Sequence, residues 1–573
     1  MEPHDCWGAV TPALPKDTAP RECRQHETQV TDDRYDLSTT TQPGGSVSLV
    51  TELSFSESLL VGLTAEQREA VMSPHRQLLI RATAGAGKTH VLTLRIQRQL
   101  ATEEFEPDHI LAMTFTRKAA DELRQRLYGN GMRGIKAGTF HRAAIDIVSD
   151  FRRDNNLKQL VIEPSRRKLL RDLMAQMSEA GEPTFQDWQL AKIEQELAWA
   201  LSQGFNGTTY GRRASRNRRT TPVPPAQMAD IIDRYVGLCA ARGVVDFDLL
   251  LMEAIAILRD ERAALASFRH RHRSLFVDEA QDMNPLQFSL LRLMAGDDPT
   301  LFCVGDPNQS IYGFNGASPA LLKDLIATWP ETQVLDLTRN HRSTANIVAV
   351  ADTLLDEGAA GITPAKEEGE IPLIRAYDTD DEEARQVAAW LVGHYRPGTP
   401  WRAMAVLART NQQLIAVADA LRDLGVPFER KGADYSPGSD VVVGDVGANH
   451  WFDKTEVNAI TLSTIHRAKG LEWQVVAVIG LAEGVLPHFN ATTDEEIAEE
   501  RRLAYVALTR AEDAVLLTWN RGRHDPRTPE KLPSRFLGPI EMTIQQLRDT
   551  HAPLTGDARR ARLAAVRQQL GER

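Results

Sequence analysis

Cysteine is scarce in this sequence. Four cysteines occur in 573 residues, and no two of them form a C-x2-C pair. They are Cys6, Cys23, Cys239 and Cys303. An iron–sulfur cluster or a zinc site needs several converging ligands, so this spacing argues against both kinds of centre. We expect reduced thiols without a structural role.

Long apolar runs and a surplus of positive charge are also absent. No run approaches the roughly 18 residues that cross a bilayer, and the N-terminus has no basic region followed by an apolar stretch. The 67 Lys and Arg residues are outnumbered by 78 Asp and Glu, for a net charge of −11. We therefore expect a cytoplasmic protein without membrane contact. Any nucleic-acid site must gather its cations in a local groove.

The composition changes along the chain, whose length exceeds what one hydrophobic core usually supports. A start rich in Thr, Ser, Asp, Pro and Gly predicts a disordered leader. Polar helical sequence predicts an insertion into a first α/β domain, interrupted by a loop with Arg212, Arg213, Arg216, Arg218 and Arg219. The predicted segments are a leader (1–57), a first domain (58–150 and 246–335), a helical insertion (151–245), a second domain (336–540) and a helical tail (541–573).

Short apolar segments alternate with stretches of helical spacing. Strands are predicted near 78–80, 110–113, 274–277, 301–304, 334–337, 403–407, 459–462 and 475–479. Ordered structure is expected to begin at a helix that Thr64 and Gln67 cap. Strands that alternate with helices imply parallel sheets covered on both faces.

The first predicted strand runs into a glycine-rich loop that is followed by a helix. The loop, ATAGAGKT, consists of Ala82, Thr83, Ala84, Gly85, Ala86, Gly87, Lys88 and Thr89. It fits the phosphate-binding P-loop, with Ala82 in place of the first glycine. Lys88 supplies a charge to the β- and γ-phosphates, and Thr89 offers a hydroxyl to Mg²⁺. The loop predicts ATP and Mg²⁺ as cofactors.

A second apolar strand ends in two carboxylates, Asp278 and Glu279. With a P-loop present, Asp278 is expected to hold Mg²⁺ through water, and Glu279 to orient or deprotonate the attacking water. Hydrolysis also needs cations near the γ-phosphate, and Arg342 and Arg510 are candidates. By themselves, these arginines would more often be ordinary surface residues.

Together these segments resemble the UvrD/Rep/PcrA-like superfamily-one helicases. The matching blocks, in the family's order, are LTAEQREAV (63–71), ATAGAGKT (82–89), MTFTRKAADELRQRL (113–127), GTFHRAA (138–144), VDFDLLL (245–251), VDEAQD (277–282), VGDPNQSIYGFNGA (304–317), LTRNHRS (337–343), TIHRAKGLEW (464–473) and RRLAYVALTRAED (501–513). The resemblance implies an α/β fold with two RecA-like parallel-sheet domains in tandem. Relatives carry a second large insertion where residues 433–457 here suggest only a loop.

The resemblance also implies roles at the nucleotide. Gln67 would read the adenine edge, Gln309 would sense the γ-phosphate, and Glu472 would contact the ribose. Arg342 and Arg510 would be the two arginine fingers. His90 and His341 flank the expected base position, where relatives usually have arginine and tyrosine.

For nucleic acid, the resemblance implies a strand-tracking groove with aromatic faces and polar groups. The matching positions are Thr114, Phe115, Thr116, Thr139, Phe140, His141, Tyr312, Phe314 and His466. Phe314 stands where relatives usually have tryptophan. For Phe115, Phe140 and Phe314 the alternative interpretation is core packing.

The implied activity is ATP-driven movement along single-stranded DNA, with 3′-to-5′ polarity. The expected partners are single-stranded or tailed duplex DNA, and proteins of repair, recombination or defence. An ATP-gated component of a larger complex is a second interpretation. A nuclease fusion is disfavoured, because no carboxylate–lysine nuclease block follows residue 513. The arginine-rich loop predicts a salt-dependent DNA contact, with a solvated loop as the alternative.

Overall fold

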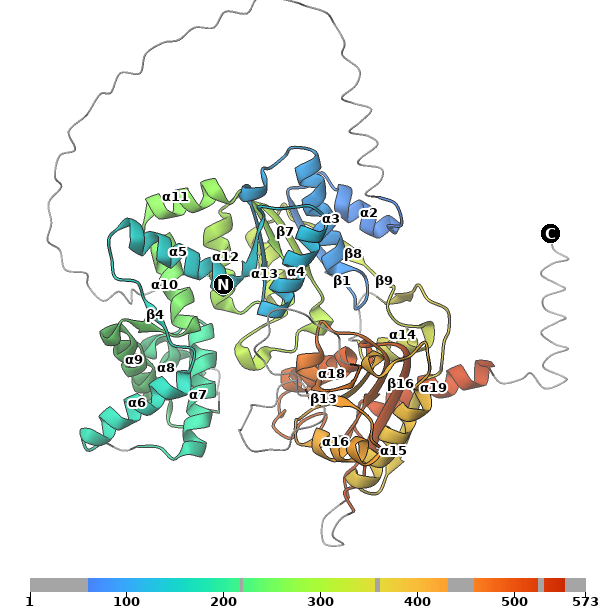
Figure 1. Cartoon of the computed structure of the whole chain (residues 1–573). Helices are drawn as coiled ribbons and strands as arrows, with labels where there is room; N and C mark the ends of the chain where they lie inside the picture. The colour runs from blue at the N-terminus through green and yellow to red at the C-terminus, as the bar shows by residue number, and fades with distance from the viewer. Residues whose placement is uncertain are drawn as a thin grey trace, which may run out of the picture.

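The computed structural model describes residues 60–182, 184–216, 220–355, 361–430, 458–523 and 530–551. Two six-stranded sheets, each parallel throughout, form the centres of two α/β domains, as Figure 1 shows. This arrangement confirms the predicted fold class. The predicted leader, the 433–457 loop, Arg218 and Arg219 lie outside the described residues.

The first sheet has the strand order β3-β2-β6-β7-β1-β8. Its strands are β1 (Gln77–Ala82), β2 (Ile110–Thr114), β3 (Lys136–Thr139), β6 (Ser274–Val277), β7 (Thr300–Gly305) and β8 (Gln333–Leu337). All the strands predicted for this domain are present. However, β8 pairs with β1 up to Leu337, so the first sheet extends beyond the predicted boundary at residue 335. An apolar pattern does not show which sheet a strand joins.

Helices cover both faces of this sheet. They are α2 (Ala65–Met72), α3 (Lys88–Ala101), α4 (Arg117–Gly129), α5 (Phe140–Asp154), α10 (Phe247–Asp260), α11 (Arg262–Arg271), α12 (Pro285–Ala295) and α13 (Leu321–Thr328). In β1, Leu78 and Ile80 belong to one buried cluster and Leu79 to the other, because successive side chains point to opposite faces. The predicted capping box of Thr64 and Gln67 begins α2.

The insertion packs against α10 and α12 of the first domain, in the teal to green part at the lower left of Figure 1. Its helices are α6 (Arg166–Glu179), α7 (Asp187–Ser202), α8 (Gly207–Arg216) and α9 (Pro225–Arg242), and a short ribbon at its base joins β4 (Val161–Ile162) to β5 (Val244–Val245). The predicted arginine loop is wrong up to residue 216, because Arg212, Arg213 and Arg216 lie on α8. Tyr210 and Ala214, four residues apart, bury one face of that helix.

The second sheet has the order β11-β16-β15-β12-β14-β13. Its strands are β11 (Leu373–Tyr377), β12 (Met404–Ala408), β13 (Phe428–Arg430), β14 (Ile460–Thr464), β15 (Trp473–Val478) and β16 (Ala511–Asn520). The helices of this domain are α14 (Ala345–Asp352), α15 (Asp380–His394), α16 (Gln413–Asp423), α17 (Ile465–Ala468), α18 (Asp494–Leu508) and α19 (Leu537–His551). Ile540 and Ile544 of α19 are buried in this domain's core, so residue 541 does not begin a separate tail. Among the described residues, no helix is both long and apolar enough to cross a membrane.

Candidate functional site

The P-loop joins the carboxyl end of β1 to the N-terminus of α3. Gly85 and Gly87 both have left-handed backbone conformations, with φ of 71° and 82°. At Gly85 a Cβ would lie 2.8 Å from Asn340 Oδ1 and 2.9 Å from Arg342 Cβ, so the loop is also tightly packed there. Glycine is needed for both reasons. A glycine loop before a helix N-terminus is a cradle that fits the phosphates of ATP.

Two acidic side chains face this loop from the end of β6. Thr89 Oγ1 donates a hydrogen bond of 2.9 Å to Asp278 Oδ2. Hard oxygen ligands of this kind suit Mg²⁺, which would neutralise phosphate charge when bound. Glu279 has φ of 55°, a left-handed conformation that is strained for a residue with a side chain.

The two neighbouring carboxyl groups titrate in opposite directions. Burial raises the pKa of Asp278, and the charge of Glu279 adds to this effect. Burial would also raise the pKa of Glu279, but the charges of Lys88, Lys469 and Arg510 and the hydrogen bond from Gln281 together lower that pKa. A low pKa keeps Glu279 ionised, the form that can accept a proton from water.

Lys88 and Gln309 share one buried partner, Asp306. Lys88 Nζ lies 4.0 Å from Asp306 Oδ2, and Gln309 Nε2 donates to the same oxygen at 2.7 Å. We did not predict Asp306, although it lies within the quoted block at 304–317. Lys469 and Asp282 were also missed, and Lys469 Nζ lies 2.6 Å from Asp282 Oδ2. Asp306, Asp282 and Lys469 each lie inside one of the matching motifs, and that position was the signal that could have identified them.

The second domain contributes both predicted arginine fingers. Arg510 Nη2 lies 3.5 Å from Gln309 Oε1, and burial, with the charge of Arg342, lowers the pKa of Arg510 to about 9. Arg342 Nε donates to Glu472 Oε2 at 2.6 Å, and its Nη1 donates to Thr509 O at 3.1 Å. Both guanidinium groups therefore lie in the region between the domains, near the P-loop. Glu472, the residue expected to contact the ribose, forms an ion pair with Arg342 in this structure.

The residues expected near the base also lie beside the P-loop. Gln67 is buried, and its Nε2 donates to Ala86 O at 3.0 Å. His341 N donates to Gly85 O at 3.0 Å, and the side chains of His341 and His90 are exposed. Partial burial lowers the pKa of each histidine, and the charges of Arg126 at His90 and Arg339 at His341 add to this effect. A neutral imidazole face suits stacking on a base.

An aromatic cluster lies between the two domains. The Phe314 ring is 6.0 Å from Tyr312 and 5.6 Å from His466, and Tyr312 Oη donates to His466 O at 3.1 Å. Phe314 is 46% exposed, so its face is open to a ligand. Burial, together with the charges of Arg409 and Lys469, lowers the pKa of His466 to about 4. The cluster is therefore uncharged at neutral pH.

The remaining predicted nucleic-acid residues divide into buried and accessible groups. Phe140 is fully buried and Thr114 is 1% exposed, so neither side chain is open to a ligand in this structure. Phe140 instead packs 5.4 Å from Phe115, which is partly exposed. Thr116 and Thr139 accept hydrogen bonds that cap α4 and α5.

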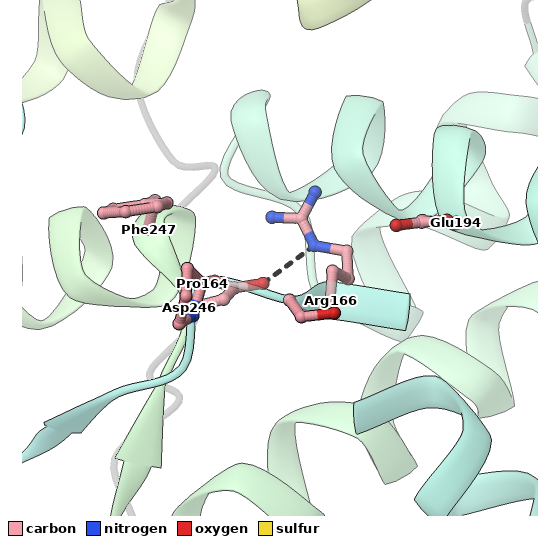
Figure 2. A pocket seen from close by; sticks show the side chains of 6 residues that line it. Pro164, Arg166, Glu194, Asp246 and Phe247 are labelled. Atoms are coloured by element: carbon pink, nitrogen blue, oxygen red, sulfur yellow. Dashed lines mark hydrogen bonds and ion pairs between the residues drawn. The ribbon is translucent and has the colours of Figure 1, made fainter. Parts of the chain in front are cut away.

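A cavity of about 520 Å³ lies at the base of the insertion, away from the P-loop. Figure 2 shows Arg166 pointing toward Asp246, to which its Nε donates at 2.8 Å. Phe247 lines the same cavity and lies 5.3 Å from the ring of His141, whose pKa burial lowers to about 4. The Arg166–Asp246 pair fastens the insertion to the first domain near His141.

Two family models match most of the chain. The UvrD/REP helicase N-terminal domain matches residues 63–330, and the UvrD-like helicase C-terminal domain matches 335–434 and 448–522. The chain belongs to the UvrD/REP helicase family. As a UvrD-type helicase it has the tandem parallel sheets and interdomain site described above.

Curated relatives agree with this assignment. The chain is 30% identical to the ATP-dependent DNA helicase UvrD2 of Mycobacterium tuberculosis, over 89% of this chain and 85% of the relative. It is 24% identical to the ATP-dependent DNA helicase PcrA of Staphylococcus aureus, over 85% of this chain and 87% of that protein. A shorter match, 31% identical over 65% of this chain and 52% of the relative, is to DNA helicase II of Escherichia coli.

Proposed function

We propose that this UvrD-type helicase hydrolyses ATP with Mg²⁺ to move 3′-to-5′ along single-stranded DNA and separate a duplex ahead of it. The observation that carries the proposal is the position of Gln309. It lies 3.5 Å from Arg510 of the second domain, and a few residues later the same segment presents the exposed Phe314. Phosphate and base contacts thus share one short segment between two domains.

Each side chain then has a role in hydrolysis. Lys88 and the P-loop hold the phosphates, while Thr89 and Asp278 would hold Mg²⁺. Glu279 accepts the proton of the attacking water. Arg342 and Arg510 stabilise the charge that develops on the γ-phosphate, so turnover requires the two domains to close.

For DNA, the exposed ring of Phe314 and the partly exposed rings of Tyr312 and His466 supply stacking platforms worth about 1–3 kcal/mol per base. Domain closure would displace this cluster relative to the strand. The polarity rests on the resemblance of the motifs. We further propose a cytoplasmic location and tailed duplex DNA as the substrate, with protein partners in repair, recombination or defence.

The test compares ATP turnover and strand displacement on 3′-tailed, 5′-tailed and blunt duplexes. We expect displacement of the 3′-tailed substrate only, and turnover stimulated by single-stranded DNA. Glu279→Gln should still bind ATP but should not displace the strand. Preference for the 5′ tail would refute the polarity, and turnover without displacement would favour an ATP-gated component of a larger assembly.

A further inference from the structure

Helix α18 and the turn after it contact residues 309–313 within the segment at residues 309–316. Arg510, just beyond the end of the helix, reaches Gln309, as described above. Near the start of α18, Glu499 Oε1 accepts a hydrogen bond of 2.9 Å from Gly313 N. Glu499 and Arg510 are about 16 Å apart at the rise of an α-helix. One helix therefore contacts both the phosphate-sensing end and the aromatic end of the segment.

A third contact lies between these two. Arg502 Nε donates a hydrogen bond of 2.8 Å to Ser310 O. From residue 309 to residue 313, the three contacts are made by residues progressively nearer the start of α18. An α-helix of this length moves as a rigid body. A shift of α18 is therefore transmitted to the backbone of the segment at several points together.

A side chain at position 313 would require the Glu499 carboxylate to move. A Cβ built on Gly313 would overlap Glu499 Oε2 and would lie 3.0 Å from Glu499 Cδ. Burial raises the pKa of Glu499 above its usual value, although the hydrogen bond from Gly313 opposes this shift. The carboxylate lies against the backbone between Tyr312 and Phe314.

The insertion borders the other end of the segment. Gly316 has φ of 82°, and a Cβ at this position would overlap Ser202 Oγ at the end of α7. Phe314 therefore lies between the contact with α7 at Gly316 and the α18 carboxylate at Gly313. Only the α18 side belongs to the domain that carries Arg510.

We propose that Glu499 is a positioning residue that ties the Tyr312–Phe314 aromatic platform to α18, so that the platform and Arg510 move together when the domains close. This inference rests on the proposed function. Glu499 touches neither nucleotide nor strand. Its contribution is the efficiency with which hydrolysis is converted into movement, and not hydrolysis itself.

The experiment measures DNA-free ATP turnover, DNA-stimulated turnover, nucleotides travelled per ATP and melting temperature of the full chain. In Glu499→Ala we expect about tenfold fewer nucleotides travelled per ATP, with DNA-free turnover within about twofold of the parent. Glu499→Gln keeps an oxygen that accepts from Gly313 N, and it should restore most of the coupling. Glu495→Ala, an exposed carboxylate on the same helix, is the matched control and should match the parent.

A double-mutant cycle separates a specific contact from general damage. Gly313→Ala should lower coupling about tenfold, because its Cβ displaces the carboxylate. The Gly313→Ala, Glu499→Ala double variant should be no worse than either single variant, because the overlap is then gone. Unchanged coupling in Glu499→Ala, additive losses in the double variant, or an equal loss of DNA-free turnover would overturn the inference. Failure of the parent to move on DNA would instead refute the proposed function.

Discussion

The hydroxyl of Thr89 donates directly to Asp278 Oδ2, at 2.9 Å, and so connects α3 to the end of β6. Both side chains are the expected Mg²⁺ ligands. Replacing Asp278 with Asn keeps an oxygen but removes the charge that attracts the cation. We expect Asp278→Asn to raise the half-saturating Mg²⁺ concentration about tenfold and to lower turnover on the order of a hundredfold. ATPase assays across a Mg²⁺ titration measure both effects.

Asp298→Asn is the control for that experiment, because Asp298 is an exposed carboxylate paired with Arg76 on the surface. It should titrate with Mg²⁺ as the parent does. An unshifted Mg²⁺ titration in Asp278→Asn would remove this carboxylate from the metal site.

Arg342 is engaged by Glu472 and by Thr509 O, which orient its guanidinium between the domains. Arg342→Ala should lower DNA-stimulated kcat by on the order of 10³, with KM for ATP changed less than about threefold, because the lost interaction is with transition-state charge. Steady-state kinetics measure the separation of kcat from KM. Arg339→Ala, an exposed arginine nearby, should retain normal kcat; a kcat of Arg342→Ala within tenfold of the parent would contradict the role.

Phe140 and Phe314 should respond oppositely to truncation. Phe140 is fully buried, so Phe140→Ala should cost about 3–5 kcal/mol of unfolding free energy. Phe314→Ala should leave the melting temperature nearly unchanged and weaken single-strand binding by about 1–3 kcal/mol. Thermal melts and fluorescence anisotropy provide the two measurements. A large fall in melting temperature for Phe314→Ala would indicate core packing there as well.

These two rings show how far the sequence could predict the site. The predicted strands and the capping box of α2 are present, because local patterns determine them. A motif, however, names both rings without saying which of them a neighbouring layer covers. The same limit applies to β8, whose partner strand is distant in sequence, and to Glu499, whose contact with Gly313 exists only after the two domains meet.

Arg212 and Arg213 are exposed on α8 of the insertion. Each phosphate that the protein neutralises steepens the slope of log affinity against log salt by about 0.9 for duplex or 0.7 for single-stranded DNA. Substituting all five arginines (212, 213, 216, 218 and 219) with Ala should therefore flatten this slope on a tailed duplex. Turnover with saturating single-stranded DNA should stay near normal. Binding titrations at several salt concentrations measure the slope, and an unchanged slope would mean that these arginines do not contact DNA.

His466 should make stability depend on pH. Its pKa is about 4 in the folded chain, below the usual 6.5, because burial opposes the charge. Between these values the unfolded chain binds more protons, so the unfolding free energy falls as pH drops from about 6.5 toward 4 and is unaffected above 6.5. At pH 5 this histidine should lower the unfolding free energy by about 1–2 kcal/mol. Between pH 7.5 and pH 5 the melting temperature should fall less for His466→Gln than for the parent. His75→Gln, an exposed control, should behave as the parent does. Equal falls in all three proteins would contradict the prediction.

The pairing of β1 has a consequence for how the chain reaches its fold during synthesis. Leu78 is in register with Phe302 on one side and with Gln333 on the other. Ribosomes add about 5–20 residues per second, so β1 emerges on the order of tens of seconds before its neighbours exist. Its apolar side chains and open edges are exposed throughout that interval, a condition that favours aggregation. Recovery of soluble protein should therefore improve with added chaperones, which cover the exposed strand of the nascent chain and leave the folded protein unchanged.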